Sequence, residues 1–394
     1  MDQLVFERAR TALYLVFTAD ALSMPVHWFY NPTDIVRAFP GTQGVKRMEA
    51  APASHPSSIM SLHSTRQGGR TAAGLAGAGA KEIVGDVILK GKRQFWGKSS
   101  THYHHGLPAG ENTLNAYCAR LMLRYLGAEP SYQTKSWVQE YIRFMTAEVP
   151  QHPDTYAESY HRGFFANLMA GQPPDKCGQV THDTPSVGAF VTVAPLAIVE
   201  LLRQGKDKVP NVQRMARAHL SLTHPDESLF RICDEYVQLM SDLLWRSPQE
   251  SPQGILKSIA TKRVAEGRSV DLEALLTRAP RDDGSINSLQ ADLQVVGGTF
   301  SPACYISDSW PSLLYLATRY WDLPDRGLLA NTNVGGENCH RGSVLGSLLG
   351  LCSVGPLTGE ALGLTKQLRN YDAISKEIET VLSKVQAEKT RSDL

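Results

Sequence analysis

Helical periodicity is the dominant structural signal in this chain, and it is clearest in the segment after Gly110. Apolar side chains there recur at offsets of three, four, seven and eleven residues: Leu114, Tyr117, Cys118, Leu121 and Tyr125. These offsets place them on one stripe of a helix. A helix with such a stripe buries it against the core. Convincing alternation with a period of two, the pattern of half-buried strands, is missing. The sequence therefore predicts an all-α fold.

Further helices are predicted at about 4–22, 135–147, 188–204, 211–222, 227–245, 270–278, 309–320, 341–352 and 373–388. Stretches rich in Gly, Pro, Ser and His are interpreted as loops, at 38–80, 90–111 and 246–254. A loop as long as the first is uncommon in a compact domain unless it has a role, such as gripping a substrate. Because there is no internal repeat and no low-complexity linker, residues 1–394 are interpreted as a single domain.

Small residues mark the helix predicted at 341–352. Gly342, Gly346 and Gly350 are spaced by four and share one face, where another helix can approach closely. Each glycine costs roughly 1 kcal/mol relative to alanine in a helix interior, so close packing must compensate for it. Ordinary core packing of a buried helix is the alternative interpretation.

The charge balance limits the partners. Forty Lys and Arg against 39 Asp and Glu leave a net charge of +1, so no long-range field gathers nucleic acid or an anionic membrane surface. No stretch approaches the ~20 apolar residues that cross a bilayer. The six cysteines form no CxxC motif, which argues against a disulfide scaffold, so a reducing, cytoplasmic environment is expected.

Two short segments combine glycine with polar residues at the entrance of a predicted helix: residues 110–113 (GENT) and 335–342 (GGENCHRG). A carboxylate in the first turn interacts favourably with the helix dipole, which alone would explain Glu111. Two such segments, more than 220 residues apart, make a shared site more plausible. We hypothesise that the Glu111 and Glu337 carboxylates face one pocket, where helix N-termini would suit a phosphorylated ligand.

Four blocks of the sequence, in order, resemble one known family. Residues 19–25 (ADALSMP) are similar to its GDALG segment, 188–196 to its motif of glycine, alanine and proline, 222–224 to its LTH triplet, and 333–340 (NVGGENCH) to its GGDTDT signature. This family is the ADP-ribosylglycohydrolases, which include the dinitrogenase reductase-activating glycohydrolases. The four blocks span roughly residues 10–352, nearly the full chain.

The resemblance implies an all-α, orthogonal helical bundle that binds two magnesium ions. It implies hydrolysis of the glycosidic bond from ADP-ribose, or from a related N- or O-linked ribosyl group, through an oxocarbenium-like state. The partner would be an ADP-ribosylated or ribosylated small molecule or protein. Glu111 and Glu337 would be the catalytic carboxylates at the anomeric carbon.

The resemblance also implies which residues stand at the metal positions. The family's TDD segment corresponds to Gly110, Glu111 and Asn112, and its DxDT segment to Glu337, Cys339 and His340. The carboxylate that follows its GDALG block is matched by His27. The candidate metal ligands are therefore Glu111, Asn112, Glu337, Cys339, His340 and His27.

Of these candidate ligands, only Glu111 and Glu337 keep a negatively charged oxygen. Magnesium prefers oxygen, whereas cysteine and histidine favour softer ions such as zinc or iron. Three hypotheses remain open: a different, single metal ion, metal-free acid and base chemistry by the two glutamates, or a lost activity with a retained pocket for ADP-ribose or a nucleotide. A glycosidase for another nucleoside is a further alternative.

Seven residues are candidates for substrate binding: His182, Asp183, Ser186, Gly188, His224, Gly335 and Gly336. Asp183 could orient the His182 imidazole, or the pair could form a loop turn. The serine and the glycines allow close backbone approach to phosphate or ribose. His224 matches the family's LTH histidine, which contacts ligand, and a histidine favourably placed at a helix C-terminus is the alternative. The histidines of residues 101–105 (THYHH) could serve a softer metal, a phosphate or a proton transfer, or lie in a solvated loop.

Overall fold

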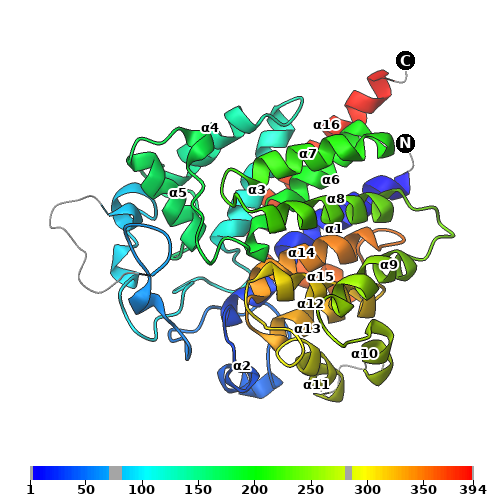
Figure 1. The fold of residues 1–394 in the computed structure, drawn as a ribbon, viewed down its shortest axis with the longest axis horizontal. Coiled ribbons are helices and arrows are strands. Elements are labelled where there is room, and N and C mark those ends of the chain that lie inside the picture. Colours follow the sequence, from blue (N-terminus) through cyan, green and yellow to red (C-terminus); the bar gives the residue numbers. More distant parts are fainter. Residues whose placement is uncertain (1–2, 71–81, 280–285, 393–394) are drawn as a thin grey trace.

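The computed structural model describes residues 3–70, 82–279 and 286–392 of the chain (Figure 1). Over these ranges it contains helices, short turns and isolated bridges but no strand, which confirms the all-α class. The α-helices are α1 (Gln3–Ser23), α2 (Pro32–Ala38), α3 (Leu114–Ala128), α4 (Thr134–Met145), α5 (Ser159–Met169), α6 (Val193–Gln204), α7 (Val209–Leu220), α8 (Glu227–Trp245), α9 (Pro252–Ala265), α10 (Leu272–Arg278), α11 (Ile286–Val295), α12 (Ile306–Arg319), α13 (Pro324–Val334), α14 (Asn338–Leu351), α15 (Gly359–Lys366) and α16 (Tyr371–Ser392).

Helices α1 and α14 are packed against each other at the centre of the molecule (Figure 1). The glycines of α14 make this possible, because a Cβ atom on Gly346 would lie 2.4 Å from the Leu15 carbonyl oxygen. A Cβ on Gly350 would lie 2.3 Å from the Ala12 Cα. The Ser343 hydroxyl donates to the Val16 carbonyl at 3.1 Å in the same interface. The predicted close approach of another helix to these glycines is therefore confirmed.

The predicted helices agree best where an amphipathic or apolar run is long. Those at 4–22 and 227–245 correspond to α1 and α8. The helix predicted from residue 188 begins at Val193, because residues 187–190 form a 3-10 turn in which the Ser186 hydroxyl oxygen accepts the Gly188 N–H. Helix α9 begins inside the predicted loop 246–254, where Ser251 caps its first turn. Its buried stripe of small and aliphatic side chains was too sparse to signal a helix.

The predicted long loop at 38–80 is described up to residue 70, and residues 71–80 lie outside the described part. Its described part holds two short 3-10 turns, Pro40–Thr42 and Met60–Leu62. Residues between 57 and 70 line the cavity described below, among them Ser57, His63 and Arg70. The loop therefore forms one wall of the site.

Among the described residues, the stretch Val187–Gln204 is long and apolar enough to cross a membrane by length and composition alone. In the folded protein 83% of this stretch is buried. It comprises a 3-10 turn and α6, whose side chains pack into the core between α3 and α7.

Candidate active site

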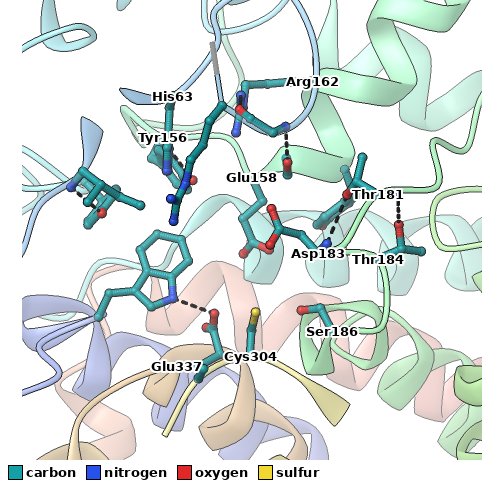
Figure 2. A pocket seen from close by; sticks show the side chains of 18 of the residues that line it. His63, Tyr156, Glu158, Arg162, Thr181, Asp183, Thr184, Ser186, Cys304 and Glu337 are labelled. Carbon is teal, nitrogen blue, oxygen red and sulfur yellow. Dashed lines mark hydrogen bonds between the residues drawn. The ribbon is translucent and has the colours of Figure 1, made fainter. Parts of the chain in front are cut away.

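A cavity of about 380 Å³ opens between the loops that precede α3, α5, α6 and α12 (Figure 2). This volume lies within the range of small-molecule sites, roughly 300–1,000 Å³. Its wall is rich in aromatic side chains: Trp28, Tyr30, Tyr103, Tyr156, Tyr160 and Tyr305. Three carboxylates reach it, those of Glu158, Asp183 and Glu337. It is thus an aromatic pocket with an acidic floor.

A glycine turn places Glu337 at the floor. Helix α13 ends at Val334, the next two glycines have φ of +73° and +67°, and Glu337 then stands at the N-cap position of α14 without a capping hydrogen bond from its side chain. A Cβ on Gly335 would lie 2.2 Å from the Phe29 carbonyl oxygen, and one on Gly336 would lie 2.1 Å from the Pro302 carbonyl oxygen. These glycines were expected to allow a ligand close to the backbone. They instead allow two protein loops to pack on the turn, and neither lines the cavity.

The loop after α1 is locked onto this turn by its backbone. The Trp28 N–H donates to the Gly336 carbonyl, and the Gly336 N–H donates to the Phe29 carbonyl, both at 2.8 Å. Trp28 has a φ of +64°, a left-handed conformation that is costly for a bulky residue and is held only by its surroundings. Its indole Nε1 donates to Glu337 Oε2 at 2.7 Å (Figure 2). The strained residue therefore fixes one oxygen of the floor carboxylate.

Five buried side chains and the partly exposed Glu158 form one continuous series, which we call the carboxylate–histidine chain: Asp154, His104, His27, Glu337, His340 and Glu158. The successive contacts are Asp154 Oδ1 to His104 Nδ1 at 2.8 Å, His104 Nε2 to His27 Nδ1 at 2.7 Å, and His27 Nε2 to Glu337 Oε1 at 2.7 Å. They continue from Glu337 Oε1 to His340 Nδ1 at 2.7 Å and from His340 Nε2 to Glu158 Oε1 at 3.0 Å. The chain thus runs from the N-terminus of α3 to the cavity.

The charges of this chain stabilise one another. Burial alone raises the pKa of Glu337, but His340 and His27 outweigh it and hold that pKa well below its usual value. Burial lowers the pKa of His340, but Glu158 and Glu337 outweigh it and raise that pKa well above 6.5. Burial lowers the pKa of His27 to about 3, although Glu337 opposes this. These shifts favour a protonated His340 imidazole beside the Glu337 carboxylate, and a neutral His27.

Glu158 reaches the cavity from the N-cap position of α5. Its Oε1 accepts a hydrogen bond from Asn115 Nδ2 at 3.1 Å and pairs with His340. Among the described residues no donor binds its Oε2, which lies beside Gly188, where a Cβ would be 3.2 Å away. Burial raises the pKa of this carboxyl group. One oxygen of Glu158 is thus held in place while the other is left for a ligand.

Glu111 does not share this cavity, which corrects the expectation that its carboxylate and that of Glu337 face one pocket. Glu111 Oε1 accepts hydrogen bonds from the Tyr117 hydroxyl at 2.9 Å and from Asn370 Nδ2 at 3.0 Å. The segment before α16 covers it, since the Arg369 N–H donates to the Gly110 carbonyl at 2.9 Å. Glu111 is therefore engaged in joining the start of α3 to the C-terminal segment.

Two other expected metal ligands also face protein atoms. Asn112 Nδ2 donates to Asp20 Oδ2 and to the Phe17 carbonyl, both at 2.9 Å. The Cys339 thiol donates to the Asp20 carbonyl at 3.6 Å, and burial raises its pKa well above the usual value. Neither side chain lines the cavity.

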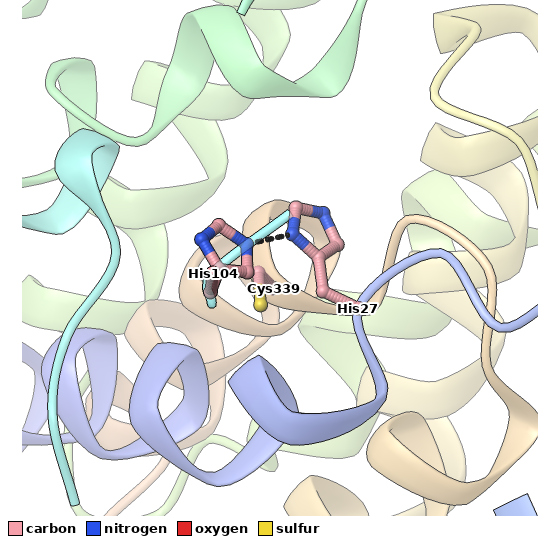
Figure 3. A group of neighbouring side chains, drawn as sticks. All are labelled: His27, His104 and Cys339. Carbon is pink, nitrogen blue, oxygen red and sulfur yellow. Dashed lines mark hydrogen bonds between the residues drawn. The ribbon is translucent and has the colours of Figure 1, made fainter. Parts of the chain in front are cut away.

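Two groups of described side chains could hold a metal ion: His27, His104 and Cys339, and His27, Glu337 and His340 (Figure 3 shows the first). The magnesium pair implied by the sequence resemblance does not fit either group. Magnesium requires near-octahedral oxygen ligands, and these groups offer mostly nitrogen and sulfur. We therefore assign no step of the chemistry to magnesium.

The expected substrate-binding residues divide into two sets. Asp183 and Ser186 line the cavity, and Gly188 lies directly behind Glu158. His182 pairs with Asp183 at 3.0 Å, but its side chain is 61% exposed and does not line the cavity. His224 is buried behind Tyr160, with ring centroids 4.3 Å apart, and burial lowers its pKa to about 3.

Several members of this site were missed in the sequence, among them Trp28, Asp154 and Glu158. The two acids lie in the loop between α4 and α5, in no recognisable motif. His104 was singled out within the histidine segment, but the alternative of a solvated loop does not hold for it, because it is 2% exposed. The sequence signal for a role of His104 in the site was its position just before the helix that begins at Leu114.

A further buried histidine near the site predicts an acid-sensitive stability. His219 is bonded by the Tyr132 and Thr192 hydroxyls, each at 2.8 Å, and burial lowers its pKa to about 3. The unfolded chain, with a pKa of about 6.5, binds the extra proton first, so stability is lost as the pH falls below about 6.5 and is unaffected above it. From pH 7 to pH 5 the wild type should lose about 2 kcal/mol more than His219→Gln. Urea unfolding at both pH values measures this, and equal losses would contradict it.

The comparisons with known proteins agree with this architecture. The ADP-ribosylglycohydrolase family matches residues 1–353. A solved structure titled "ADP-ribosylglycohydrolase-related protein complex" is similar over 98% of this chain and 99% of that chain, with a TM-score of 0.53 and 15% sequence identity. At this identity the likeness concerns the fold alone. A search of curated proteins found no match.

Proposed function

Because the chain belongs to the ADP-ribosylglycohydrolase family, we propose that it hydrolyses the bond between an ADP-ribosyl group, or a related ribosyl group, and its acceptor. Family membership indicates a glycohydrolase for ADP-ribosyl-type bonds. One observation carries the finer proposal: Glu158 and Glu337 both line the cavity and pair with opposite nitrogens of His340. Most glycosidases use two carboxyl groups that flank the scissile bond of the sugar as their catalytic groups.

The hydrogen bonds suggest a different role for each glutamate. Glu337 accepts from the Trp28 indole on one oxygen and contacts His27 and His340 on the other, so it is held as an anion. An anion there stabilises the positive charge that develops on the ribose ring and orients the attacking water. Glu158 has Oε2 available to donate a proton to the leaving group. The proposed pair is therefore Glu158 as acid and Glu337 as anion, in place of the expected Glu111 and Glu337.

The wall of the cavity suits a nucleotide. Tyr30 and Tyr305 offer aromatic faces for a base, and Arg70 is an exposed cation at the rim for a diphosphate. The other arginine, Arg162, donates to the carbonyl oxygens of Ser64, Gln67 and Gly69, so it holds the 64–69 loop in place. Phosphate recognition at the rim is thus proposed for Arg70.

The test is release of ADP-ribose from ADP-ribosylated arginine and serine peptides, with magnesium, manganese or zinc and with a chelator. We expect release that does not depend on magnesium. A parallel panel of nucleosides identifies a glycosidase for another ribosyl substrate. Absence of release from every peptide and nucleoside under every condition would refute hydrolysis.

A second candidate function is binding of ADP-ribose without turnover. It is favoured by the engagement of Glu111 and Asn112 with protein atoms, which removes two positions where the family resemblance implies metal ligands. Calorimetric titration with ADP-ribose separates the two proposals. Tight binding without product supports the binding function, and product formation excludes it.

Gly188 gives a prediction about the shape of the floor. A Cβ there would lie 3.2 Å from Glu158 Oε2 and 3.4 Å from His340 Nδ1, so it would displace the acid by a few tenths of an ångström. Gly188→Ala should lower kcat/KM by roughly tenfold, because small displacements of reacting groups are costly. The matched control is Gly254→Ala in α9, where the nearest atom to a Cβ lies at 3.6 Å. Equal activity of the two variants would contradict the assignment of Glu158.

A further inference from the structure

We propose that His27, His340 and Glu337 form a site for one divalent transition metal ion of the zinc and iron(II) class at the floor of the cavity. The site is distinct from the magnesium pair that the sequence resemblance implies, in its donor atoms and in the number of ions. It goes beyond the proposed function, since metal binding is measured without any substrate.

The donor atoms of these three residues converge. Glu337 Oε1 lies 2.7 Å from His27 Nε2 and 2.7 Å from His340 Nδ1. His340 Nδ1 is buried and pairs with this oxygen, but the contact lacks the alignment of a hydrogen bond. A buried nitrogen without a hydrogen bond is costly unless another partner satisfies it. Two imidazoles and one carboxylate are the ligand set of many catalytic zinc and non-haem iron sites.

Each donor is fixed from behind, as metal ligands usually are. The far nitrogen of His340 pairs with Glu158 at 3.0 Å. The far nitrogen of His27 bonds to His104, and His104 bonds to Asp154. If each of these histidines donates toward Asp154, His27 Nε2 carries an electron pair directed at the Glu337 oxygen. A cation between the two atoms removes that repulsion.

The charge of the surroundings also favours a dication. Asp154 and Glu337 bring two buried carboxylates into the carboxylate–histidine chain, and Glu158 adds a third, partly exposed carboxyl group. Buried anions require compensating positive charge. A divalent ion between the three donor atoms would supply that charge.

The alternative group of His27, His104 and Cys339 is less suitable. An ion in either group separates a 2.7 Å contact of His27, but here the lost contact is the one with His104, which supports His27 from behind (Figure 3). None of its three residues lines the cavity, whereas Glu337 does. Ligands of a tetrahedral zinc ion lie about 3.3 Å apart. The donors of the proposed site must therefore separate by roughly half an ångström on binding.

The position of the site gives the ion a role. Three protein ligands leave a coordination position, and the cavity lies on the Glu337 side. A water molecule there would be a stronger nucleophile than free water and would stand beside the ribose of the proposed substrate. Glu158, across His340, is left to protonate the leaving group.

The experiment uses the full-length protein stripped with a chelator and titrated with zinc, cobalt(II) or iron(II). Elemental analysis after dialysis should give one ion per chain. The cobalt form should show the visible spectrum of nitrogen and oxygen ligands without a thiolate charge-transfer band. His340→Gln and Glu337→Gln should each weaken binding at least 100-fold, and Glu158→Gln, which removes a partner behind His340, by roughly 10- to 100-fold.

Cys339→Ser is the matched control, since it alters the other group and leaves the proposed ligands intact. It should bind within about threefold of the wild type, a margin chosen below the smallest effect expected of the ligand variants. Circular dichroism checks folding, and if His340→Gln does not fold, the isosteric Glu337→Gln decides. Less than half an equivalent of every ion on the wild type would overturn the site. A thiolate band, or loss of binding in Cys339→Ser, would overturn it in favour of the other group. Hydrolysis by the metal-free protein would leave the proposed function standing without the ion.

Discussion

Glu158→Gln is expected to lower kcat for ribosyl-bond hydrolysis by roughly 10²- to 10⁴-fold, the usual contribution of a general acid. The amide keeps the shape of the side chain and the contact of Oε1 with Asn115, but it cannot donate a proton of suitable acidity. The effect should fall on kcat more than on KM, because the group acts on the leaving group and not in ground-state binding. Steady-state kinetics on the released ADP-ribose measures both constants.

The control for this substitution is Glu140→Gln on α4, a partly exposed glutamate paired only with its neighbour Arg143 in the described structure. Its activity should match the wild type. Because a good leaving group needs no proton, an aryl riboside should restore much of the activity of Glu158→Gln. A loss smaller than about tenfold with the natural type of bond, below the range of a general acid, would contradict the assignment.

Gly350→Ala is expected to lower the free energy of unfolding by about 3 kcal/mol or more, at the upper end of overpacking effects. The added Cβ would lie 2.3 Å from the Ala12 Cα and 2.4 Å from the Ala12 nitrogen, so it meets backbone that cannot rotate away. Helices α1 and α14 would have to separate, and both carry the site at their ends. Urea unfolding followed by circular dichroism measures the loss.

Gly363→Ala is the matched control, because Gly363 lies inside α15 and a Cβ there would meet no atom within 4 Å. Alanine in an open helical position should stabilise the protein by up to about 1 kcal/mol. The two variants make the same chemical change and should differ in sign. If Gly350→Ala were as stable as Gly363→Ala, the close packing of α1 on α14 would be wrong.

The sequence predicted the fold class because helical periodicity is a local property. Long runs such as those of α1 and α8 repeat their apolar positions often enough to be recognised. Helices such as α9 and α13 were missed, since α9 presents a sparse apolar stripe and α13 is a polar segment buried by its tertiary neighbours. Their helical state depends on contacts that are distant in the sequence.

The site was predictable in part for the same reason. Glu337, His27 and His340 stand in short glycine- or proline-bounded segments at helix ends, which mark them locally. Glu158 and Asp154 join the carboxylate–histidine chain only because the loop before α5 packs on the start of α3, and no local pattern encodes that packing. Glu111 shared the local signal of Glu337, but the C-terminal segment covers it. Local pattern therefore identified residues at helix ends without deciding which way each side chain faces.

The carboxylate–histidine chain has a consequence for how this floor can change. Each of its six members contacts the next within 3.0 Å, so altering one changes the charge or the donor that its neighbour meets. Interaction energies in double-mutant cycles between adjacent members should therefore be large, on the order of 1–3 kcal/mol. Changes in the carboxylate–histidine chain would therefore be tolerated mainly when two or more of its residues are substituted together. Single substitutions would then reveal only part of the chemistry that this fold can support.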